Sequence, residues 1–366
     1  MSKIISIGTA VPQYGTPQNN ILDFMRKAYQ DDTASRKLTI LFNHSGINSR
    51  HSVLPDFGSE HGNPQLFYPN QILPTLEERL NVYKETALPL AVKAIRNALE
   101  NLQTTIQEFG VTHLITVTCT GLYAPGLDAE IIEQLDLPKD IFHTSINFMG
   151  CNAAFPALKL GDALAATNEN ARVLIVCVEL CTLHFQPKNN HDNLLSNTIF
   201  GDGAAAVLLV PEKNARYKNH SGLKIQGFHS ELLTRGKDLM AWNITPTNFE
   251  MVLDAKVPDF IGEEVEGIVS NAARKLSFEP GNIAKWAVHP GGKKILDMVG
   301  KQMQLTETDL KASYKVLANY GNMSSPTILF VLKEILESGI QQDETVFAIG
   351  FGPGIGIETA LLTYDK

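Results

Sequence analysis

The stretch NFMGCNAAFPALKL, residues 147–160, places a cysteine directly after a glycine at the start of a segment of small and apolar residues. Gly150 permits a sharp backbone turn, and the residues after Cys151 favour a tightly packed helix. A helix N-terminus carries about half a positive charge, which stabilises a thiolate. Cys151 is therefore either a nucleophile at the start of a buried helix or an inert core residue, because free cysteine is often fully buried.

A histidine marks the second segment, WAVHPGGKKIL, residues 286–296. The pattern predicts a strand that ends at His289, where Pro290 stops it. The two glycines that follow leave room for a ligand to approach the backbone. A histidine at a strand end is a candidate base or hydrogen-bond donor. The alternative is a turn histidine whose ring is satisfied within the core.

An asparagine stands in the third segment, NYGNMSSPTILF, residues 319–330. Ser324 or Ser325 can cap the predicted helix that follows, and Pro326 is acceptable in its first turn. Asn322 either makes this turn and nothing more, or directs its carboxamide into the same site as Cys151 and His289.

The order of apolar segments predicts a layered α/β protein. Continuous apolar runs of strand length, which indicate strands buried on both faces, occupy residues 112–120, 171–180 and 204–210. Helical patterns lie between the first two runs. The polar segment 211–222 marks a boundary, so we expect an N-terminal half at residues 1–215 with the cysteine and a C-terminal half at 216–366 with the histidine and asparagine.

Further helices and loops follow from local patterns. Residues 51–75 are rich in proline, glycine, asparagine and aspartate and predict an ordered loop. Residues 76–102 predict a helix that Pro89 bends or interrupts. The C-terminal half predicts helices at 257–276 and 324–338, a strand at KWAVHP, a helix at GGKKILDMVGK, and closing strands at ETVFAIG and GIETALLTY.

Composition excludes several classes of function. The chain has 366 residues, 44% of them hydrophobic, and a formal net charge of −8, which disfavours binding to nucleic acid or anionic membranes. Its four cysteines form no C-x-x-C pair and no zinc-like spacing with histidine, so we expect no metal site. The N-terminus lacks the features of a signal peptide, and the apolar runs are shorter than a membrane span. We therefore expect a cytoplasmic protein with reduced thiols.

Two glycine-rich segments do not predict a nucleotide site. In GFGPGIGIET, residues 350–359, the spacing is not G-x-G-x-x-G, and a strand rather than a helix follows. We interpret it as a tight turn beside a pocket. In GDGAAAVLLV, residues 201–210, we expect Asp202 to bind local backbone amides at the entrance to a buried strand.

Taken together, these segments resemble type III polyketide synthases, the chalcone and stilbene synthase family. The motifs GCNAAFPALKL, FGDGAAAVLL, WAVHPGG, YGNMSS and GFGPG occur in that family's order and spacing, and the similarity covers nearly the whole chain. The resemblance implies the thiolase fold of the wider superfamily, in which two similar halves form a five-layer αβαβα sandwich. It also implies a homodimer.

The resemblance assigns a role to each of the three candidate residues. Cys151 would accept an acyl group from a starter CoA thioester, with His289 as its ion-pair partner. His289 and Asn322 would hold the thioester carbonyl of malonyl-CoA while decarboxylation produces an enolate. Repeated condensation would give a poly-β-keto chain that cyclises. No tightly bound cofactor is implied, and malonyl-CoA and acyl-CoA are substrates.

Residues that would line the substrate cavity also follow from the resemblance. Phe200 matches the family's gatekeeper between tunnel and cavity, and Phe249 matches a second gatekeeper if the alignment has a gap. Cys181 and His184 match positions that determine the choice of starter and product in the family, and plant chalcone synthases have threonines there. Met240 replaces a common glycine. Each of the two phenylalanines has the alternative of an ordinary core residue.

The basic residues that would meet the phosphates of CoA depart from the plant pattern. Lys37 matches one of them, whereas Ile40 and His44 occupy two others. Lys293 and Lys294, which follow the glycines after His289, are candidates to substitute, and we select Lys294. The alternative is that these lysines belong to a solvated surface.

Three other functions remain open at this stage. An initiating 3-oxoacyl-acyl-carrier-protein synthase shares Cys, His and Asn, but GFGPG and YGNMSS argue against it. A cysteine hydrolase also uses Cys, His and Asn in this order, and a non-catalytic binding protein would need no reactive thiol.

Overall fold

A mixed sheet of nine strands organises the computed structural model, which describes residues 1–68 and 72–366. The strand order is β11-β12-β13-β8-β1-β7-β6-β4-β5. Within the described chain, β1 pairs with β8 through two residue pairs, Lys3–Lys224 and Ile4–Leu223, so two half-sheets meet at this corner. The strands are β1 (Ser2–Ala10), β4 (His113–Thr118), β5 (Phe142–Asn147), β6 (Val173–Leu180), β7 (Asp202–Pro211), β8 (Gly222–Leu232), β11 (Lys285–Val288), β12 (Thr345–Gly352) and β13 (Gly356–Asp365).

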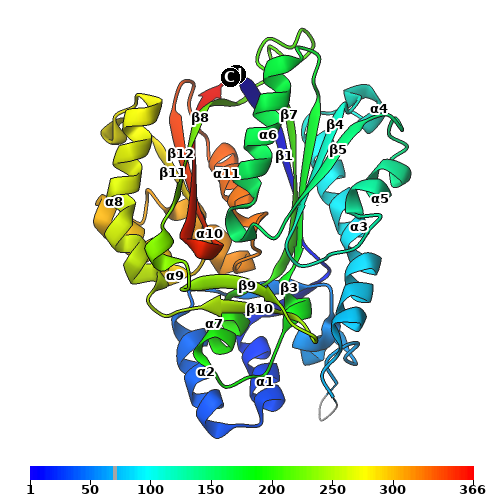
Figure 1. Ribbon diagram of the computed structural model, residues 1–366, viewed down its shortest axis with the longest axis vertical. Coiled ribbons are helices and arrows are strands. Elements are labelled where there is room, and N and C mark those ends of the chain that lie inside the picture. Colours follow the sequence, from blue (N-terminus) through cyan, green and yellow to red (C-terminus); the bar gives the residue numbers. More distant parts are fainter. Residues whose placement is uncertain (69–71) are drawn as a thin grey trace.

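Helices alternate with the half-sheets to give five layers (Figure 1). Helices α3 (Leu76–Asn101) and α5 (Leu127–Gln134) cover one outer face, and α8 (Val257–Leu276) and α9 (Lys293–Met303) cover the other. Between the half-sheets lie α6 (Ala154–Thr167) and α11 (Thr327–Glu337). The expected five-layer αβαβα arrangement is therefore confirmed.

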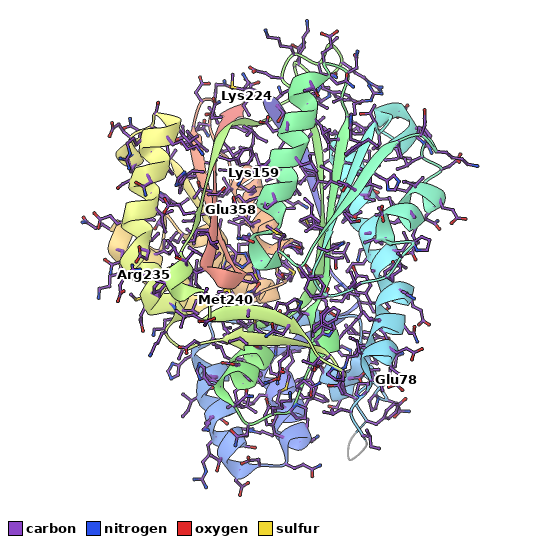
Figure 2. All side chains as sticks on the ribbon, viewed as in Figure 1. Glu78, Lys159, Lys224, Arg235, Met240 and Glu358 are labelled. Atoms are coloured by element: carbon purple, nitrogen blue, oxygen red, sulfur yellow. The ribbon has the colours of Figure 1, made fainter. Side chains whose placement is uncertain are left out.

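The strands at the centre are buried on both faces. In β6, Leu174 and Val176 pack into the core beneath α3, while Val173 and Ile175 pack against the central helices. In β12, alternate residues likewise divide between the central core and the core beneath α8. Apolar residues at every position serve two cores at once, which is the physical reason for the continuous apolar runs in the sequence. Lys159 of α6 forms an ion pair with Glu358 of β13, which joins the central layer to the C-terminal half-sheet (Figure 2).

Smaller elements close one end of the sandwich (Figure 1). They are α1 (Gln18–Tyr29), α2 (Asp32–His44), α7 (His191–Ile199), the strand pair β2 (Tyr14–Pro17) and β3 (Ser49–Ser52), and the hairpin β9 (Met240–Ile244) and β10 (Phe249–Leu253). The remaining helices are α4 (Ile106–Phe109) and α10 (Lys311–Tyr320). Ligand sites in α/β proteins lie at the carboxyl ends of parallel strands. The residues that follow β4, β6, β11 and β12 reach this closed end.

Most predicted segments match the structure, with identifiable exceptions. The helix predicted at 76–102 is continuous, so Pro89 lies inside α3 without interrupting it. The loop predicted at 51–75 contains short 3-10 turns at Pro55–Phe57 and Ser59–His61, and its residues 69–71 lie outside the described part of the chain. Strands β8 to β10 were not predicted, because half-exposed strands lack a continuous apolar run. No helix in the described part is long and apolar enough to cross a membrane.

A pair of glycine substitutions tests the close packing of β1 on α3. A side chain at Gly8 would lie 2.2 Å from Ala94 O and 2.2 Å from Ala98 N, which are backbone atoms that cannot turn away. Gly8→Ala should lower the free energy of unfolding by about 1–3 kcal/mol or more. Gly267 in α8 has open space around it, so Gly267→Ala should raise the same quantity by about 0.4–1 kcal/mol. Urea unfolding of both variants provides the measurement, and an unchanged Gly8→Ala protein would contradict this packing.

Candidate active site

A narrow cavity opens beneath the closed end of the sandwich. It contains about 790 Å³ of space free of atoms, part of it open to solvent. Six residues selected from the sequence line it together: Cys151, Cys181, His184, Phe200, Met240 and Phe249. They come from the start of α6, the turn after β6, the end of α7 and the hairpin β9–β10. Figure 2 shows Met240 on β9, at the closed end of the sandwich.

Cys151 lies in a tight turn directly before α6, as the sequence predicts. Gly150 has a φ of 80°, and a side chain there would approach Pro353 Cδ to 2.1 Å, so glycine is required at this position. The thiol is buried and contacts the carboxamide of Asn322, with Sγ 3.8 Å from Nδ2 and 3.9 Å from Oδ1.

The orientation of the Asn322 carboxamide is determined by its neighbours. Its Oδ1 accepts a hydrogen bond of 2.8 Å from the backbone N–H of Ser324. Its Nδ2 therefore faces the sulfur of Cys151, and it also donates to Gly291 O at 3.3 Å. The arrangement places an amide N–H donor beside the thiol within a buried site.

His289 follows β11 and is 1% exposed. Its backbone N–H donates to Ile349 O at 2.8 Å, but neither ring nitrogen has a hydrogen-bond partner within the described residues. A side-chain atom on Gly291 would lie 3.9 Å from Nε2, so glycine keeps the space beside this nitrogen free of a neighbouring side chain. Because Asn322 binds the carbonyl of Gly291, the imidazole, the carboxamide and the thiol are connected through this turn.

Burial determines the protonation of the thiol and the imidazole. It raises the pKa of Cys151 to about 11 and lowers the pKa of His289 to about 3. Each group taken separately is neutral near pH 7. The thiolate–imidazolium pair implied by the resemblance stays a prediction, and it requires the proton of Sγ to move to the ring.

His184 acts in this structure as a neutral clamp on the cavity wall. Its Nε2 donates to Thr120 O at 2.8 Å, and its Nδ1 accepts from the backbone N–H of Phe249 at 3.1 Å. The ring stacks on Phe249 with centroids 4.5 Å apart. Burial lowers the pKa of His184 to about 3, so the ring holds no extra proton. His184 therefore offers the cavity a ring face rather than a proton.

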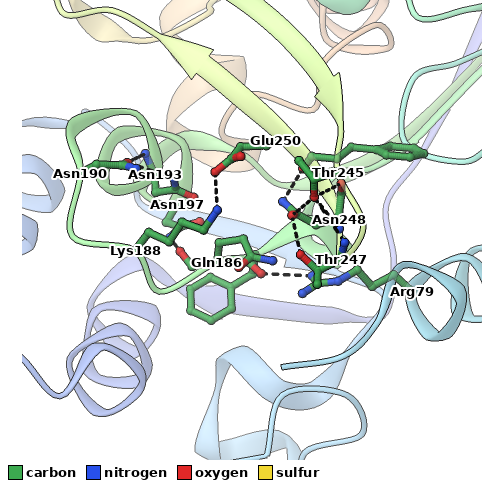
Figure 3. Close-up of polar contacts among 12 residues, drawn as sticks. Arg79, Gln186, Lys188, Asn190, Asn193, Asn197, Thr245, Thr247, Asn248 and Glu250 are labelled. Carbon is green, nitrogen blue, oxygen red and sulfur yellow. Dashed lines mark hydrogen bonds and ion pairs between the residues drawn. The ribbon is translucent and has the colours of Figure 1, made fainter. Parts of the chain in front are cut away.

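Polar side chains form another part of the wall (Figure 3). Asn193 and Asn197 of α7 line it together with Asn248 and Glu250 of the hairpin. Glu250 forms an ion pair of 2.6 Å with Lys188, which connects the loop before α7 to β10. This part of the wall is therefore polar, and Lys188 balances the charge of its carboxylate.

The two lysines selected for CoA lie in different surroundings. Lys294 lines a second hollow of about 1,030 Å³, together with Ile40 and His44, and is paired with Asp259 at 3.0 Å. Lys37 is exposed on α2 and donates to Asn189 Oδ1 at 3.4 Å. Lys37 is not one of the residues that line this hollow in the described structure.

Sequence reasoning missed a buried carboxylate behind the cavity. Glu179 is fully buried at the end of β6, where Oε2 accepts from Cys119 N at 2.9 Å and Thr120 Oγ1 at 2.8 Å. Its Oε1 accepts from Ser325 Oγ at 2.6 Å. The signal was the single acidic residue in the apolar run ARVLIVCVEL. Asp202, expected to bind local amides, instead binds the N–H groups of residues 53 and 182, which are distant in sequence.

The pH dependence of stability tests the environment of Glu179. Burial raises its pKa from 4.5 to about 7, so the folded protein keeps a proton that the unfolded chain releases. The titration of Glu179 therefore lowers the free energy of unfolding as pH rises from about 4.5 to about 7. The decrease is at most about 1.4 kcal/mol per pH unit. Glu179→Gln should remove that slope, measured as the free energy of unfolding in urea between about pH 5 and about pH 8. Equal slopes in both proteins would mean that Glu179 titrates normally.

Comparison with known proteins agrees with this geometry. The models of the N-terminal and C-terminal domains of chalcone and stilbene synthases match residues 1–212 and 224–364. A relative from Bacillus subtilis is 30% identical over 100% of both chains. A 3,5-dihydroxyphenylacetyl-CoA synthase of Streptomyces toyocaensis is 29% identical over 99% of this chain and 90% of its own.

Solved structures share the whole fold. PKS-I from the brown alga Ectocarpus siliculosus superposes with a TM-score of 0.90 at 28% identity, over 99% of this chain and 98% of its own. The C-terminal type III polyketide synthase domain of Steely1 from Dictyostelium has a TM-score of 0.90 at 27% identity and covers 99% of both chains. The chain belongs to the chalcone and stilbene synthase family and is a type III polyketide synthase, a CoA-dependent acyltransferase with the thiolase-like fold.

Proposed function

We propose that this enzyme loads an acyl group from an acyl-CoA starter onto Cys151, extends it with malonyl-CoA, and cyclises the product to a pyrone, a resorcinol or a related aromatic ring. The observation that carries the proposal is the contact of the Cys151 thiol with the Nδ2 of Asn322, which also donates to Gly291 O in the turn after His289. A nucleophile, a proton carrier and a neutral donor then meet in one buried site.

Loading needs the thiol to lose a proton. His289 takes the proton of Cys151 Sγ, and the sulfur attacks the thioester carbonyl of the starter. The bond between this carbonyl and the CoA sulfur breaks, and CoA leaves with the proton from the imidazolium. Because burial opposes both charges, the ion pair is stabilised mainly by the mutual attraction of the two groups at short range.

The extension step depends on the hydrogen-bond donors of Asn322 and His289 and needs no proton from Cys151. The thioester oxygen of malonyl-CoA accepts hydrogen bonds from Asn322 Nδ2 and the ring of His289. The bond to the carboxylate breaks, CO₂ leaves, and the electron pair forms an enolate whose charge develops on that oxygen. Each such donor in a dry site contributes ~2.7–4 kcal/mol. The enolate carbon attacks the acyl group and releases the Cys151 thiolate for the next round.

We propose that the side chains of the cavity wall determine which ring product forms. Cys181, Phe200, Met240 and the His184–Phe249 stack line the cavity and limit the space for a growing chain. Among the relatives, one is named a 3,5-dihydroxyphenylacetyl-CoA synthase and another is named for alpha-pyrone synthesis. We propose these two ring types as the first products to test, with mass spectrometry after incubation with malonyl-CoA and a panel of acyl-CoA starters.

The halves of the chain divide the chemistry in this proposal. Residues 1–215 carry the nucleophile, and residues 216–366 carry His289 and Asn322. Lys294 meets the CoA phosphates at the second hollow, where its present partner Asp259 has to release it. Lys37 on α2 attracts the CoA phosphates from a longer distance through its positive charge.

Substitution of the nucleophile separates condensation from decarboxylation. Cys151→Ala should abolish polyketide formation and retain decarboxylation of malonyl-CoA, because the two donors remain. Intact-mass spectrometry should detect the acyl group on the wild type and not on the variant. Cys177→Ala, which changes a thiol in the central core, is the matched control and should still be acylated. Full condensation by Cys151→Ala would refute the proposal.

We also propose that two copies of the chain pair through β5. This strand ends the sheet, each of its residues is exposed or half-exposed, and Phe142 is 46% exposed. Light scattering should give twice the chain mass of 40.2 kDa for the wild type. Phe142→Asp should shift this mass toward one chain, whereas Ile72→Asp, at an exposed apolar residue elsewhere, should not. A monomeric wild type would contradict the pairing.

A further inference from the structure

The C-terminal end of α7 is held by donors from three distant parts of the chain. The last carbonyls of a helix lack partners within the helix, and here three successive ones receive a donor each. The pairs are Gln18 Nε2 to Thr198 O at 2.8 Å, the backbone N–H of Asn322 to Ile199 O at 2.9 Å, and Arg50 Nη1 to Phe200 O. One of these donors is the backbone of the proposed catalytic asparagine.

Arg50 is a buried cation that is held at the C-terminal end of α7. It is 4% exposed, and its Nε donates to Gln18 Oε1 at 2.9 Å. Its positive charge lies at the negative end of the α7 dipole, which is favourable. Burial lowers the pKa of Arg50 to about 9 and the nearby carboxylate of Asp202 opposes this shift, so the guanidinium is charged at neutral pH.

The backbone of Asn322 is locked to the residues that Arg50 holds. Besides its bond to Ile199 O, Asn322 accepts at its own carbonyl from the N–H of Gly201 at 3.0 Å. These two bonds form a parallel bridge between Phe200 and Asn322. Packing is tight at this crossover, because a side-chain atom on Gly321 would lie 2.6 Å from Ile199 O and 2.9 Å from Arg50 Cδ.

We propose that Arg50, supported by Gln18, is a positioning residue for Asn322. Its head group holds the end of α7 and its stem packs against Gly321, so the crossover keeps the carboxamide of Asn322 directed at Cys151. The inference rests on the proposed function in one respect, namely that Asn322 donates to the thioester oxygen of malonyl-CoA. Arg50 also lines the cavity, but in this proposal it touches no reacting atom.

The geometry needs a guanidinium rather than any cation. Arg50 binds Gln18 Oε1 and Phe200 O through two different nitrogens of one rigid plane. A lysine keeps the charge but lacks this fork. Arg50→Lys is therefore a substitution that preserves charge and removes the positioning.

Malonyl-CoA decarboxylation measures the effect without any condensation. Arg50→Lys should lower kcat about 10-fold to 100-fold, as small displacements of a catalytic group do, and leave KM within about 2-fold, as expected when an interaction of the transition state is lost. In the double variant with Asn322→Ala, Arg50→Lys should have no further effect, because both changes remove the same interaction. Additive losses would overturn the proposal.

Arg79→Lys is the matched control (Figure 3). Arg79 is also fully buried and also donates to main-chain carbonyls, those of residues 74, 183 and 185, which lie outside the Phe200–Asn322 crossover. The Arg79→Lys variant should lose thermal stability, as Arg50→Lys does. Its kcat for malonyl-CoA decarboxylation should stay at the wild-type value. An equal fall of kcat in both variants would mean that Arg50 is merely structural.

Hydrogen exchange decides the question independently of activity. The amides of residues 199–203 and 320–324 should exchange faster in Arg50→Lys and remain protected in Arg79→Lys. If the wild type does not decarboxylate malonyl-CoA, the proposed function fails, while exchange still shows whether Arg50 holds the crossover. If Arg50→Lys does not fold, Gln18→Met removes the bonds of Gln18 to Arg50 and Thr198 and takes its place in both measurements. Unchanged exchange would refute the positioning role.

Discussion

The contact between the sulfur of Cys151 and the carboxamide of Asn322 joins the two halves of this chain at one buried point. Cys151 stands at the start of α6 in the central layer, and Asn322 stands in the turn before α11 in the same layer. The contact exists because both helices pack between the half-sheets. Every chemical step proposed for this enzyme requires that α6 and α11 keep their relative position within this layer.

Burial gives the site its electrostatic character. The thiol of Cys151 and the ring of His289 are both driven toward their neutral forms, as the directions of their pKa shifts show. A dry site also strengthens each hydrogen bond to a developing charge. The ordered donors therefore matter more here than they would in water, and Glu179 helps to hold the turn that carries Asn322, because its Oε1 accepts from Ser325 Oγ.

Local patterns in the sequence were sufficient for much of the fold. Strands β6 and β7 were predicted because apolar residues fill both faces, and α8 was predicted with its observed bounds because its apolar residues recur at helical spacing. The continuity of α3 through Pro89 was not predicted, because the helix has tertiary packing on β1 that outweighs the local cost of proline. Likewise, β9 and β10 form a hairpin whose pairing and contact with His184 depend on distant residues.

The sequence by itself determined the residue types of the site and their order: a cysteine after a glycine, a histidine at a strand end and an asparagine in a turn. It did so because each has a local backbone requirement that leaves a mark, such as the positive φ of Gly150. Only the tertiary structure decided what these residues face. Glu179 behind the cavity, the clamp of His184 and the hold of Arg50 on α7 join segments far apart in the chain, and no local pattern encodes the distance between two segments that meet only after folding.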